Sequence, residues 1–162
     1  MKILVIGAAG RTGKAAVERA IAAGHQVTAF VRDAGELHVD GVRVVEGDAT
    51  NENAVEAAIR DQDAVLDTVG GTTPYKQTTL ETSVARVVIT AMEAEITASA
   101  LEWVILRPAI LTDDPAGGRV RVYSEDDGEQ AHKISRADLA AFIVDQLSSD
   151  EHLRRMVTIA SS

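Results

Sequence analysis

Short apolar runs alternate along the chain with amphipathic helical patterns. Residues 2–6 are apolar at successive positions, which is typical of a central parallel strand because both of its faces are buried. Residues 11–23 carry apolar side chains at helical spacing, and the pattern stops at Gly24. Further strands are expected at 26–31, 42–46 and 64–69, with a helix at 52–60. This order predicts an α/β fold with a doubly wound, mostly parallel sheet in a three-layer αβα arrangement.

The second half of the chain is less regular. Its pattern predicts a long helix over 80–100, strands at 103–106, 119–123 and 156–160, an extended piece near Lys133 and Ile134, and a helix over 136–147. Ser135 is expected to be the N-cap of that last helix, and Asp138 suits its positive first turn. We expect a single domain over 1–162 with a small β/α extension at its C-terminal end.

Composition narrows the possible chemistry. The absence of cysteine excludes disulfides and thiolate catalysis, and the 4 histidines lack metal-ligand spacing, so no metal site is expected. No apolar run is long enough to span a membrane and no secretory signal pattern is present, which predicts a cytoplasmic protein. The net charge of −9 repels nucleic acid and anionic lipid, unless it reflects only a solvated acidic surface. We therefore expect a small-molecule substrate, and an anionic cofactor would need local positive groups.

Three glycines at three-residue spacing, Gly7, Gly10 and Gly13, lie between the first strand and the first helix. In that context the first glycine permits a tight turn, the second lets a pyrophosphate approach the backbone, and the third lets the helix pack on the strand. The helix N-terminus offers unpaired N–H groups to the phosphates. The expected contacts here are Gly7, Ala9, Gly10, Arg11, Thr12 and Gly13. The alternative is a tight turn that binds nothing.

The spacing differs from the common G-x-G-x-x-G fingerprint. The stretch VIGAAGRTGKAAVERAIAAGHQVTAFVRD resembles the NmrA-like, NAD(P)H-binding branch of the atypical short-chain dehydrogenase/reductases, which includes flavin reductase/biliverdin-IXβ reductase. Further matches are Gly47-Asp48-Ala49, Val69-Gly70-Gly71, LEWVILRPAILTD and ISRADLAAFI. The resemblance runs nearly end to end and implies a Rossmann fold that binds a nicotinamide cofactor.

The residues after the second strand bear on which cofactor binds. A carboxylate there favours NAD, whereas a guanidinium pairs with the 2′-phosphate of NADP. Asp33 lies at the nominal acidic position, but Arg32 comes first after the strand and Arg11 is available from the glycine turn. In the family this arginine pair goes with NADPH, so we expect NADP and consider NAD less favoured. The alternative for Arg32 is an exposed side chain paired with Asp33.

The resemblance implies three further groups of cofactor contacts: Asp48 and Ala49 beside the adenine, Val69, Gly70 and Gly71 beside the ribose, and Pro108, Ala109 and Ile110 facing the nicotinamide. A turn or cap role for Asp48 and ordinary strand ends for the other two groups are open alternatives. Asp67 lies inside an apolar strand, so its carboxylate needs a partner or a position toward the cleft.

No catalytic residue can be assigned. Tyr75 and Lys76 are adjacent and so cannot form the Tyr-x-x-x-Lys pair, which needs helical i, i+4 spacing, and Tyr123 has no such lysine. His132 is a lone histidine of the kind that is more often structural than catalytic.

Helix runs into helix between Met92 and Leu101, where relatives have a fifth strand. Without that strand, the strands at 64–69 and 103–106 would lack partners on facing edges. The sequence therefore predicts that a segment is absent between Met92 and Glu93, and a Cα–Cα separation well above about 3.8 Å there would reveal it.

Two functions follow as expectations. The first is an NADPH-dependent oxidoreductase that transfers hydride to a flat acceptor such as a flavin, quinone or tetrapyrrole, acting as a monomer or homodimer. The second is a non-enzymatic NADP-binding redox sensor of the NmrA-like type.

Overall fold

A computed structural model describes residues 1–69, 87, 104–123 and 132–161. The chain groups into two compact units, Met1–Ala100 and Leu101–Ser162, and each is described here by itself. The single domain expected from the sequence stays a prediction.

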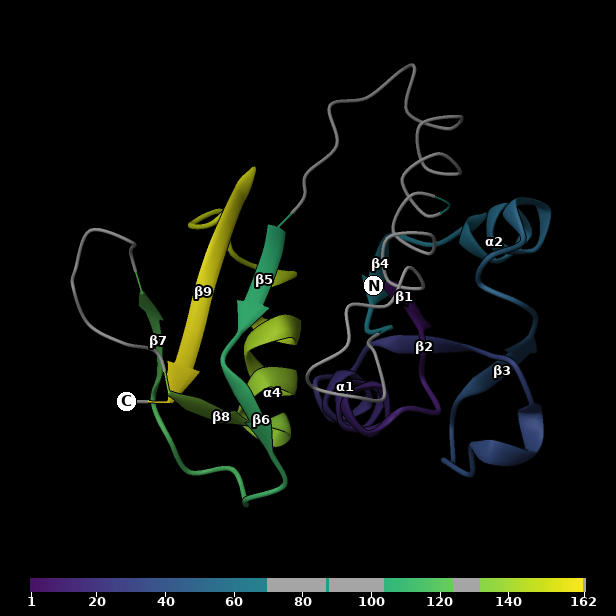
Figure 1. Ribbon diagram of the computed structural model, residues 1–162. Coiled ribbons are helices and arrows are strands. Elements are labelled where there is room, and N and C mark those ends of the chain that lie inside the picture. The colour runs from purple at the N-terminus through teal and green to yellow at the C-terminus, as the bar shows by residue number, and fades with distance from the viewer. Residues whose placement is uncertain (70–86, 88–103, 124–131, 162) are drawn as a thin grey trace. The chain divides into compact units, whose positions relative to one another are not determined.

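The first unit contains a four-stranded parallel sheet (Figure 1). Its strands are β1 (Lys2–Ile6), β2 (Gln26–Val31), β3 (Arg43–Glu46) and β4 (Ala64–Asp67), and its described helices are α1 (Arg11–Ala22), η1 (Ala34–Glu36) and α2 (Glu52–Ile59). The sheet order is β3-β2-β1-β4 and every neighbouring pair is parallel. The chain thus proceeds outward from β1 on one side and returns to its other side with β4, which confirms the doubly wound α/β fold.

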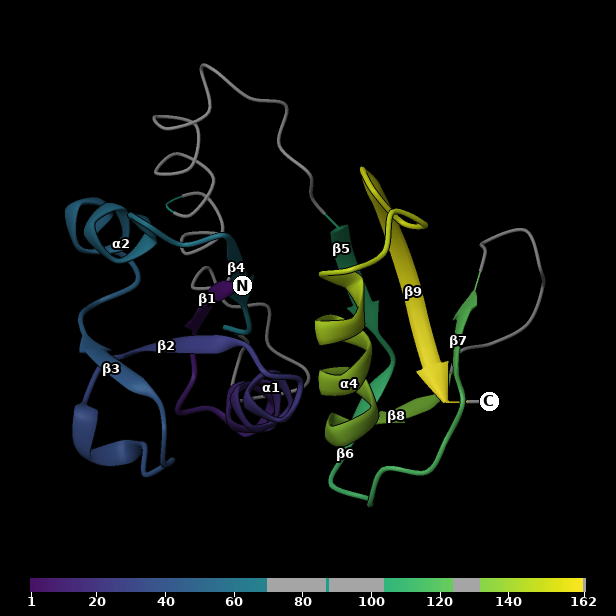
Figure 2. The same ribbon diagram turned by 180° about the vertical axis from the view of Figure 1, so that it is seen from behind.

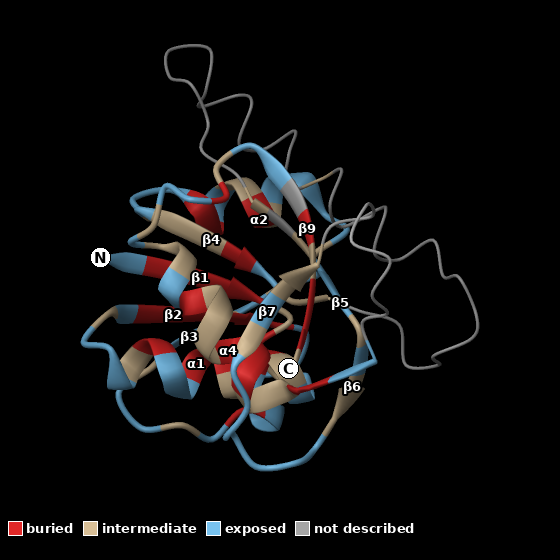
Figure 3. Ribbon diagram, turned by 90° about the vertical axis from the view of Figure 1, so that its left-hand side faces the viewer, coloured by how far each residue is buried: buried red, intermediate tan, exposed pale blue. Residues whose placement is uncertain are grey.

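Strand β1 is buried from Ile3 to Ile6, as its uninterrupted apolar run predicts (Figure 3). Leu4 and Ile6 pack in one core cluster with Phe30 of β2 and with the buried residues of α2, Val55, Ala58 and Ile59. Side chains alternate between the faces of a strand, so Ile3 and Val5 fill the opposite face. Helix α1, whose buried residues are Gly13, Ala16, Val17 and Ala20, contacts β1 and β2.

The second unit contains a three-stranded sheet with parallel and antiparallel pairs, a two-stranded parallel sheet and one described helix (Figure 2). Its elements are β5 (Val104–Pro108), β6 (Ile110–Thr112), β7 (Val120–Tyr123), β8 (Lys133–Ser135), α4 (Arg136–Gln146) and β9 (Arg155–Ser161). Strand β9 pairs in parallel with β5 and antiparallel with β7, and β6 pairs in parallel with β8. A core of Ile134, Leu139, Val157 and Ile159 lies within this unit.

The second unit differs from the expectation at two places. Residues 110–112 form β6, which pairs with β8 and which the sequence pattern does not predict. The strand expected at 103–106 is β5, which extends over Val104–Pro108, so Pro108 is its last residue. A proline is compatible with that terminal position, since it removes one donor from the ladder only where the strand stops.

The long helix expected over 80–100 and the junction of Met92 with Glu93 lie outside the described residues. Within the described part, β4 pairs with β1 and β5 pairs with β9, and no strand joins β4 to β5. The absence of a segment between Met92 and Glu93 therefore stays a prediction.

Candidate functional site

The carboxyl ends of the four parallel strands of the first unit lie at one edge of the sheet, where ligands of doubly wound folds bind. Ile6, the last residue of β1, is in register with Phe30 of β2 and with Asp67 of β4. Each strand is followed at this edge by a segment with expected site residues: Gly7, Arg32, Asp48 and Val69. The fold therefore brings the four segments of the first unit to one edge.

Gly7 makes the sharp turn out of β1. Its φ is +77°, a value that favours glycine, and a Cβ at this position would lie 3.1 Å from the backbone nitrogen of Val69. The turn thus needs glycine both for its conformation and for its close approach to the end of β4.

Gly13 lets α1 pack against the start of the glycine loop. A Cβ here would overlap the carbonyl oxygen of Gly7 and lie 2.8 Å from the Cα of Ala8. Any side chain would push the helix away from β1, so the packing role expected of the third glycine is confirmed.

Gly10 differs from the other two glycines because few of the described residues crowd it. It is exposed, and among the described residues a Cβ would meet only the Gly7 carbonyl oxygen, at 3.2 Å. It is the N-cap of α1, and no side chain caps the helix there and no acidic residue lies in the first turn. Ala9 and Thr12 are half-buried and Arg11 is exposed. The N-termini of α2 and α4 are capped by the side chains of Asn51 and Ser135, whereas no side chain of a described residue caps the N-terminus of α1.

Arg32 follows β2 with an exposed side chain. The neighbouring Asp33 is the N-cap of η1, and its Oδ1 accepts the backbone N–H of Gly35 at 2.8 Å. No ion pair joins Arg32 to Asp33 in the described part of the chain. The pairing left open as an alternative for Arg32 is therefore not found there.

Asp48 follows β3 and forms a turn with Thr50. Its Oδ1 accepts both the backbone N–H and the hydroxyl of Thr50, each at 2.8 Å. These bonds, together with the positive charge of Arg32, hold the pKa of the Asp48 carboxyl below its usual range. The turn role left open for Asp48 is thus present, and the carboxylate is ionised at neutral pH.

The backbone beside Asp48 lies close to the core. A Cβ at Gly47 would approach the Phe30 ring to 2.6 Å, and Ala49 packs against the cluster of Phe30 and α2. Gly47 therefore fixes the path of the chain out of β3.

The end of β4 is fastened to the end of β1. Both the backbone N–H and the hydroxyl of Thr68 donate to the carbonyl oxygen of Ile6, at 3.0 and 2.7 Å. The Val69 N–H donates to Oδ1 of Asp67 at 3.0 Å, which gives that carboxylate the partner it needs. Desolvation nevertheless raises the pKa of Asp67, with the Val69 bond opposing the shift.

Gly70 and Gly71, as well as Tyr75 and Lys76, lie outside the described residues. The third group of expected contacts lies in the second unit. The N–H of Ala109 donates to the Ile159 carbonyl at 2.9 Å, and that of Ile110 donates to the His132 carbonyl at 3.3 Å. Pro108 has no N–H, so these residues have only carbonyl oxygens to offer a carboxamide.

Exposed and aromatic side chains of the second unit lie on or near these strands. Ile110 is 72% exposed, which is unusual for a large apolar residue within a strand. His132 is exposed on the neighbouring segment, and Tyr123 lies below the guanidinium of Arg121, 5.3 Å from it to the ring centroid. None of these contacts indicates a proton donor.

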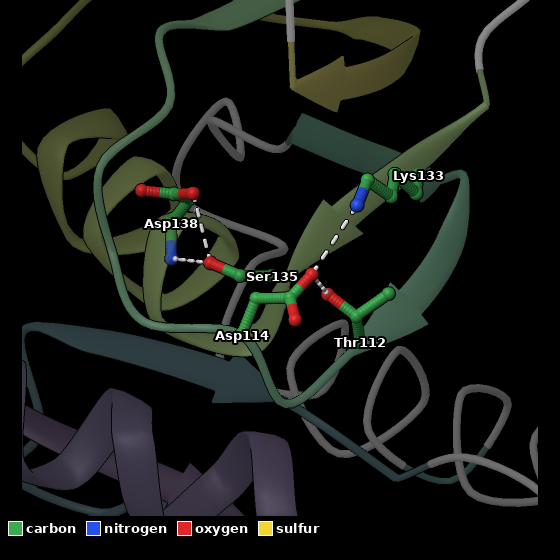
Figure 4. Close-up of polar contacts among 5 residues, drawn as sticks. All are labelled: Thr112, Asp114, Lys133, Ser135 and Asp138. Atoms are coloured by element: carbon green, nitrogen blue, oxygen red, sulfur yellow. Dashed lines mark hydrogen bonds and ion pairs between the residues drawn. The ribbon is translucent and has the colours of Figure 1, made fainter.

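The polar network around β6, β8 and α4 was predicted only at the Ser135 cap, and its bonds to Gly117 and around Asp114 were not expected (Figure 4). The Ser135 hydroxyl donates to Oδ2 of Asp138 at 2.8 Å and accepts the Asp138 N–H at 3.0 Å, which confirms Ser135 as the N-cap of α4. Asp138 also accepts the N–H of Gly117 at 3.2 Å. Asp114 accepts from Thr112 and Lys133, at 2.9 and 3.4 Å. These bonds hold the loop between β6 and β7 and have a structural role.

Neither a metal site nor a membrane-spanning helix is found where the structure is described. No group of three or more His, Cys, Asp or Glu side chains among those residues is arranged to hold a metal ion. None of the described helices is long and apolar enough to cross a membrane.

The chain is similar to a family of NAD(P)H-binding proteins and to solved Rossmann-fold structures. The chain matches the model of a family described as NAD(P)H-binding over residues 7–97 and 90–150. It is 25% identical to the uncharacterized protein YwnB of Bacillus subtilis, covering 99% of each chain. A Rossmann-fold NAD(P)-binding family protein from Shigella flexneri has a TM-score of 0.80 at 24% identity, covering 99% of this chain and 93% of that one. ChuY, an anaerobillin reductase from Escherichia coli O157:H7, has a TM-score of 0.70 at 24% identity, covering 99% and 97%.

Two details of these matches bear on the segment that the sequence predicts to be absent. The alignment with YwnB extends over 215 residues although this chain has 162, so YwnB has residues that face gaps here. The two matches to the family model meet at residues 90–97, around the junction of Met92 and Glu93. Together with the arrangement of the glycine loop, the family match over most of the sequence shows that the chain belongs to the NAD(P)H-binding family.

Proposed function

We propose that this protein is an NADPH-dependent oxidoreductase that transfers hydride to a flat acceptor of the flavin, quinone or tetrapyrrole class. The observation that carries the proposal is the uncapped N-terminus of α1, which meets the exposed Gly10 at the carboxyl edge of the sheet. A nicotinamide cofactor supplies the hydride when it is bound, and the protein binds and orients it.

The pyrophosphate would bind at the glycine loop. Gly7 and Gly13 are explained by contacts within the chain, whereas the missing side chain of Gly10 leaves space on the outer side of the helix end. Ala9, Arg11 and Thr12 complete this segment, and the partial positive charge of the helix N-terminus favours the anion.

Arg32 would select the phosphorylated cofactor. Its exposed guanidinium follows β2 at the edge where the adenosine ribose binds in doubly wound folds, and a guanidinium pairs well with a phosphate. Asp33, the residue that would accept from a ribose diol, is engaged in capping η1. These features support NADP over NAD.

The remaining contacts follow the order of the strands. Asp48 and Ala49 would border the adenine, and Val69, Gly70 and Gly71 the ribose. Pro108, Ala109 and Ile110 would face the nicotinamide through carbonyl oxygens, since their N–H groups are absent or engaged. The exposed Ile110 supports a flat, apolar acceptor, and the likeness to the anaerobillin reductase of E. coli supports a reductase.

A non-enzymatic, NADP-binding redox sensor is the second candidate. It is favoured by one observation: no described side chain at the site is placed as a proton donor. In either case we propose a cytoplasmic protein, monomeric or homodimeric, that acts on small molecules and not on nucleic acid, in keeping with the net charge of −9.

Cofactor binding and turnover together test this proposal. NADPH and NADH are titrated against the protein by nucleotide fluorescence, and NADPH oxidation is then followed with FMN, dichlorophenolindophenol and quinones. Tight NADPH binding with turnover on one of these acceptors is expected. Tight binding without turnover on any acceptor would favour the sensor, and no binding of either nucleotide would overturn both candidates.

A further inference from the structure

We propose that Glu46 is a specificity-determining residue whose carboxylate limits the preference of the site for a 2′-phosphorylated cofactor. This inference rests on the proposed function and names a residue that the glycine fingerprint does not include.

Glu46 ends β3 beside the last residue of β2. The two strands are parallel, and Glu46 is in register with Val31, the residue before Arg32. Oε2 of Glu46 accepts the backbone N–H of Ala34 at 3.2 Å, so the carboxylate lies against the loop that begins with Arg32. Its negative charge is therefore held at the backbone of Ala34, two residues along the chain from Arg32.

Three carboxylates lie in this loop or next to it, and each accepts a hydrogen bond from a backbone N–H. Asp33 accepts from Gly35, Glu46 accepts from Ala34, and Asp48 accepts from Thr50. The hydrogen bonds from Thr50 and, to a smaller extent, the positive charge of Arg32 lower the pKa of the Asp48 carboxyl, so Arg32 and Asp48 interact electrostatically. Arg32 thus begins a loop that carries or contacts three carboxylates.

The negative charges of these carboxylates should affect the binding of the two cofactors differently. A 2′-phosphate brings close to two negative charges to the loop and is repelled by every fixed carboxylate, whereas the ribose diol of NADH is neutral. Asp48 has an expected role at the adenine and Asp33 caps η1, so Glu46 is the carboxylate whose charge can be removed with the least other change.

The variant Glu46→Gln isolates the charge, because the amide oxygen of glutamine can still accept the Ala34 N–H. Asp61→Asn is the matched control. Asp61 is exposed, precedes β4 at the opposite edge of the sheet, and has a φ of +65°, which asparagine tolerates. Glu46→Lys reverses the charge and gives a second variant with a larger expected effect.

Dissociation constants for NADPH and NADH are measured for the three variants and the parent protein. We expect Glu46→Gln to tighten NADPH binding roughly two- to fivefold at low salt and to leave NADH unchanged, with a larger change for Glu46→Lys and none for Asp61→Asn. The pair 2′,5′-ADP and ADP should show the same difference, which assigns it to the phosphorylated ribose and not to the nicotinamide end.

The outcomes separate the two proposals. If both cofactors bind and their affinity ratio is the same in the parent protein, Glu46→Gln and Glu46→Lys, this inference is wrong and the proposed function stands. If neither cofactor binds to any of the proteins, the proposed function fails and this inference fails with it.

Discussion

The Asp67 carboxylate accepts the backbone N–H of Val69 at 3.0 Å, and Val69 in turn lies against Gly7 at the turn out of β1. Partial desolvation raises the pKa of the Asp67 carboxyl, although the residue keeps an exposed surface, and its bond to Val69 holds the residue that contacts Gly7. This connection makes the stability of the first unit depend on pH in a specific direction.

Asp67→Asn should stabilise the protein at neutral pH. The pKa of Asp67 is raised above 3.8 in the folded state, so folding is favoured while the group is protonated and this contribution is lost as the pH rises through the folded pKa. An asparagine is neutral at every pH and can still accept the Val69 N–H. Thermal unfolding from pH 3 to pH 8 should show a gain for Asp67→Asn at pH 7 that disappears toward acid. A gain that is equal at both ends of the range would contradict this assignment.

Gly13→Ala should destabilise the fold itself. The new Cβ would overlap the Gly7 carbonyl oxygen and approach the Ala8 Cα to 2.8 Å, so α1 must move away from β1. We expect a loss of roughly 1–3 kcal/mol in the free energy of unfolding, measured with urea. Gly117→Ala is the control, because a Cβ there meets nothing within 4 Å. An equal effect of both substitutions would mean that the contact is not the cause.

Gly10→Ala should separate binding from stability. Gly10 is exposed with φ −69° and ψ 161°, which alanine adopts, so the free energy of unfolding should change by less than about 1 kcal/mol. The methyl group would occupy the space proposed for the pyrophosphate, and NADPH affinity should fall by roughly tenfold or more. Calorimetric titration measures this loss. Unaltered NADPH affinity would remove the glycine loop from the proposed site.

Arg32→Ala should weaken NADPH binding by roughly tenfold, because the 2′-phosphate loses the guanidinium that would pair with it. NADH has no 2′-phosphate, so its binding should change little. Arg43→Ala serves as the control: Arg43 is also exposed but begins β3, at the other end of the strand pair. Fluorescence titration with both nucleotides gives the ratio of NADPH affinity to NADH affinity for each protein. Equal affinity of the parent protein for NADPH and NADH would rule out the role proposed for Arg32.

Asp138→Ala should destabilise the second unit. Asp138 is buried, and its removal leaves the Ser135 hydroxyl and the Gly117 N–H without their acceptor. A loss of about 2–3 kcal/mol is expected from the unsatisfied groups. Glu151→Ala, at an exposed position, should have little effect in the same urea titration. Hydrogen exchange at Gly117 should increase in Asp138→Ala if the loop is held as described.

The strands of the first unit could be predicted closely from the sequence. The strands at 2–6 and 26–31 have the expected bounds, since buried parallel strands are nearly continuous apolar runs with glycine at their ends. Helix α1 ends one residue before the expected position, where its last turn closes at Ala23. Strand β4 ends at Asp67 and not at residue 69, because Thr68 and Val69 turn toward Ile6 and Gly7.

The second unit was harder to predict because its pairing is non-local. Strand β6 has three residues, and its ladder partner β8 lies more than twenty positions further along the chain. Nothing in the local pattern of Ile110 to Thr112 distinguishes such a strand from a loop. The engaged N–H groups of Ala109 and Ile110 likewise depend on β9 and on His132, which only the folded chain brings beside them.

The N-cap of α1 is a glycine, so the phosphates would be held there by backbone amides rather than by an ionisable cap. Amide groups do not titrate in the range in which proteins are folded. The binding of the pyrophosphate should accordingly not depend on pH, and a pH dependence of cofactor affinity would report on the 2′-phosphate of the nucleotide. The pH dependence of NADPH affinity would thus distinguish binding of the 2′-phosphate from binding of the pyrophosphate.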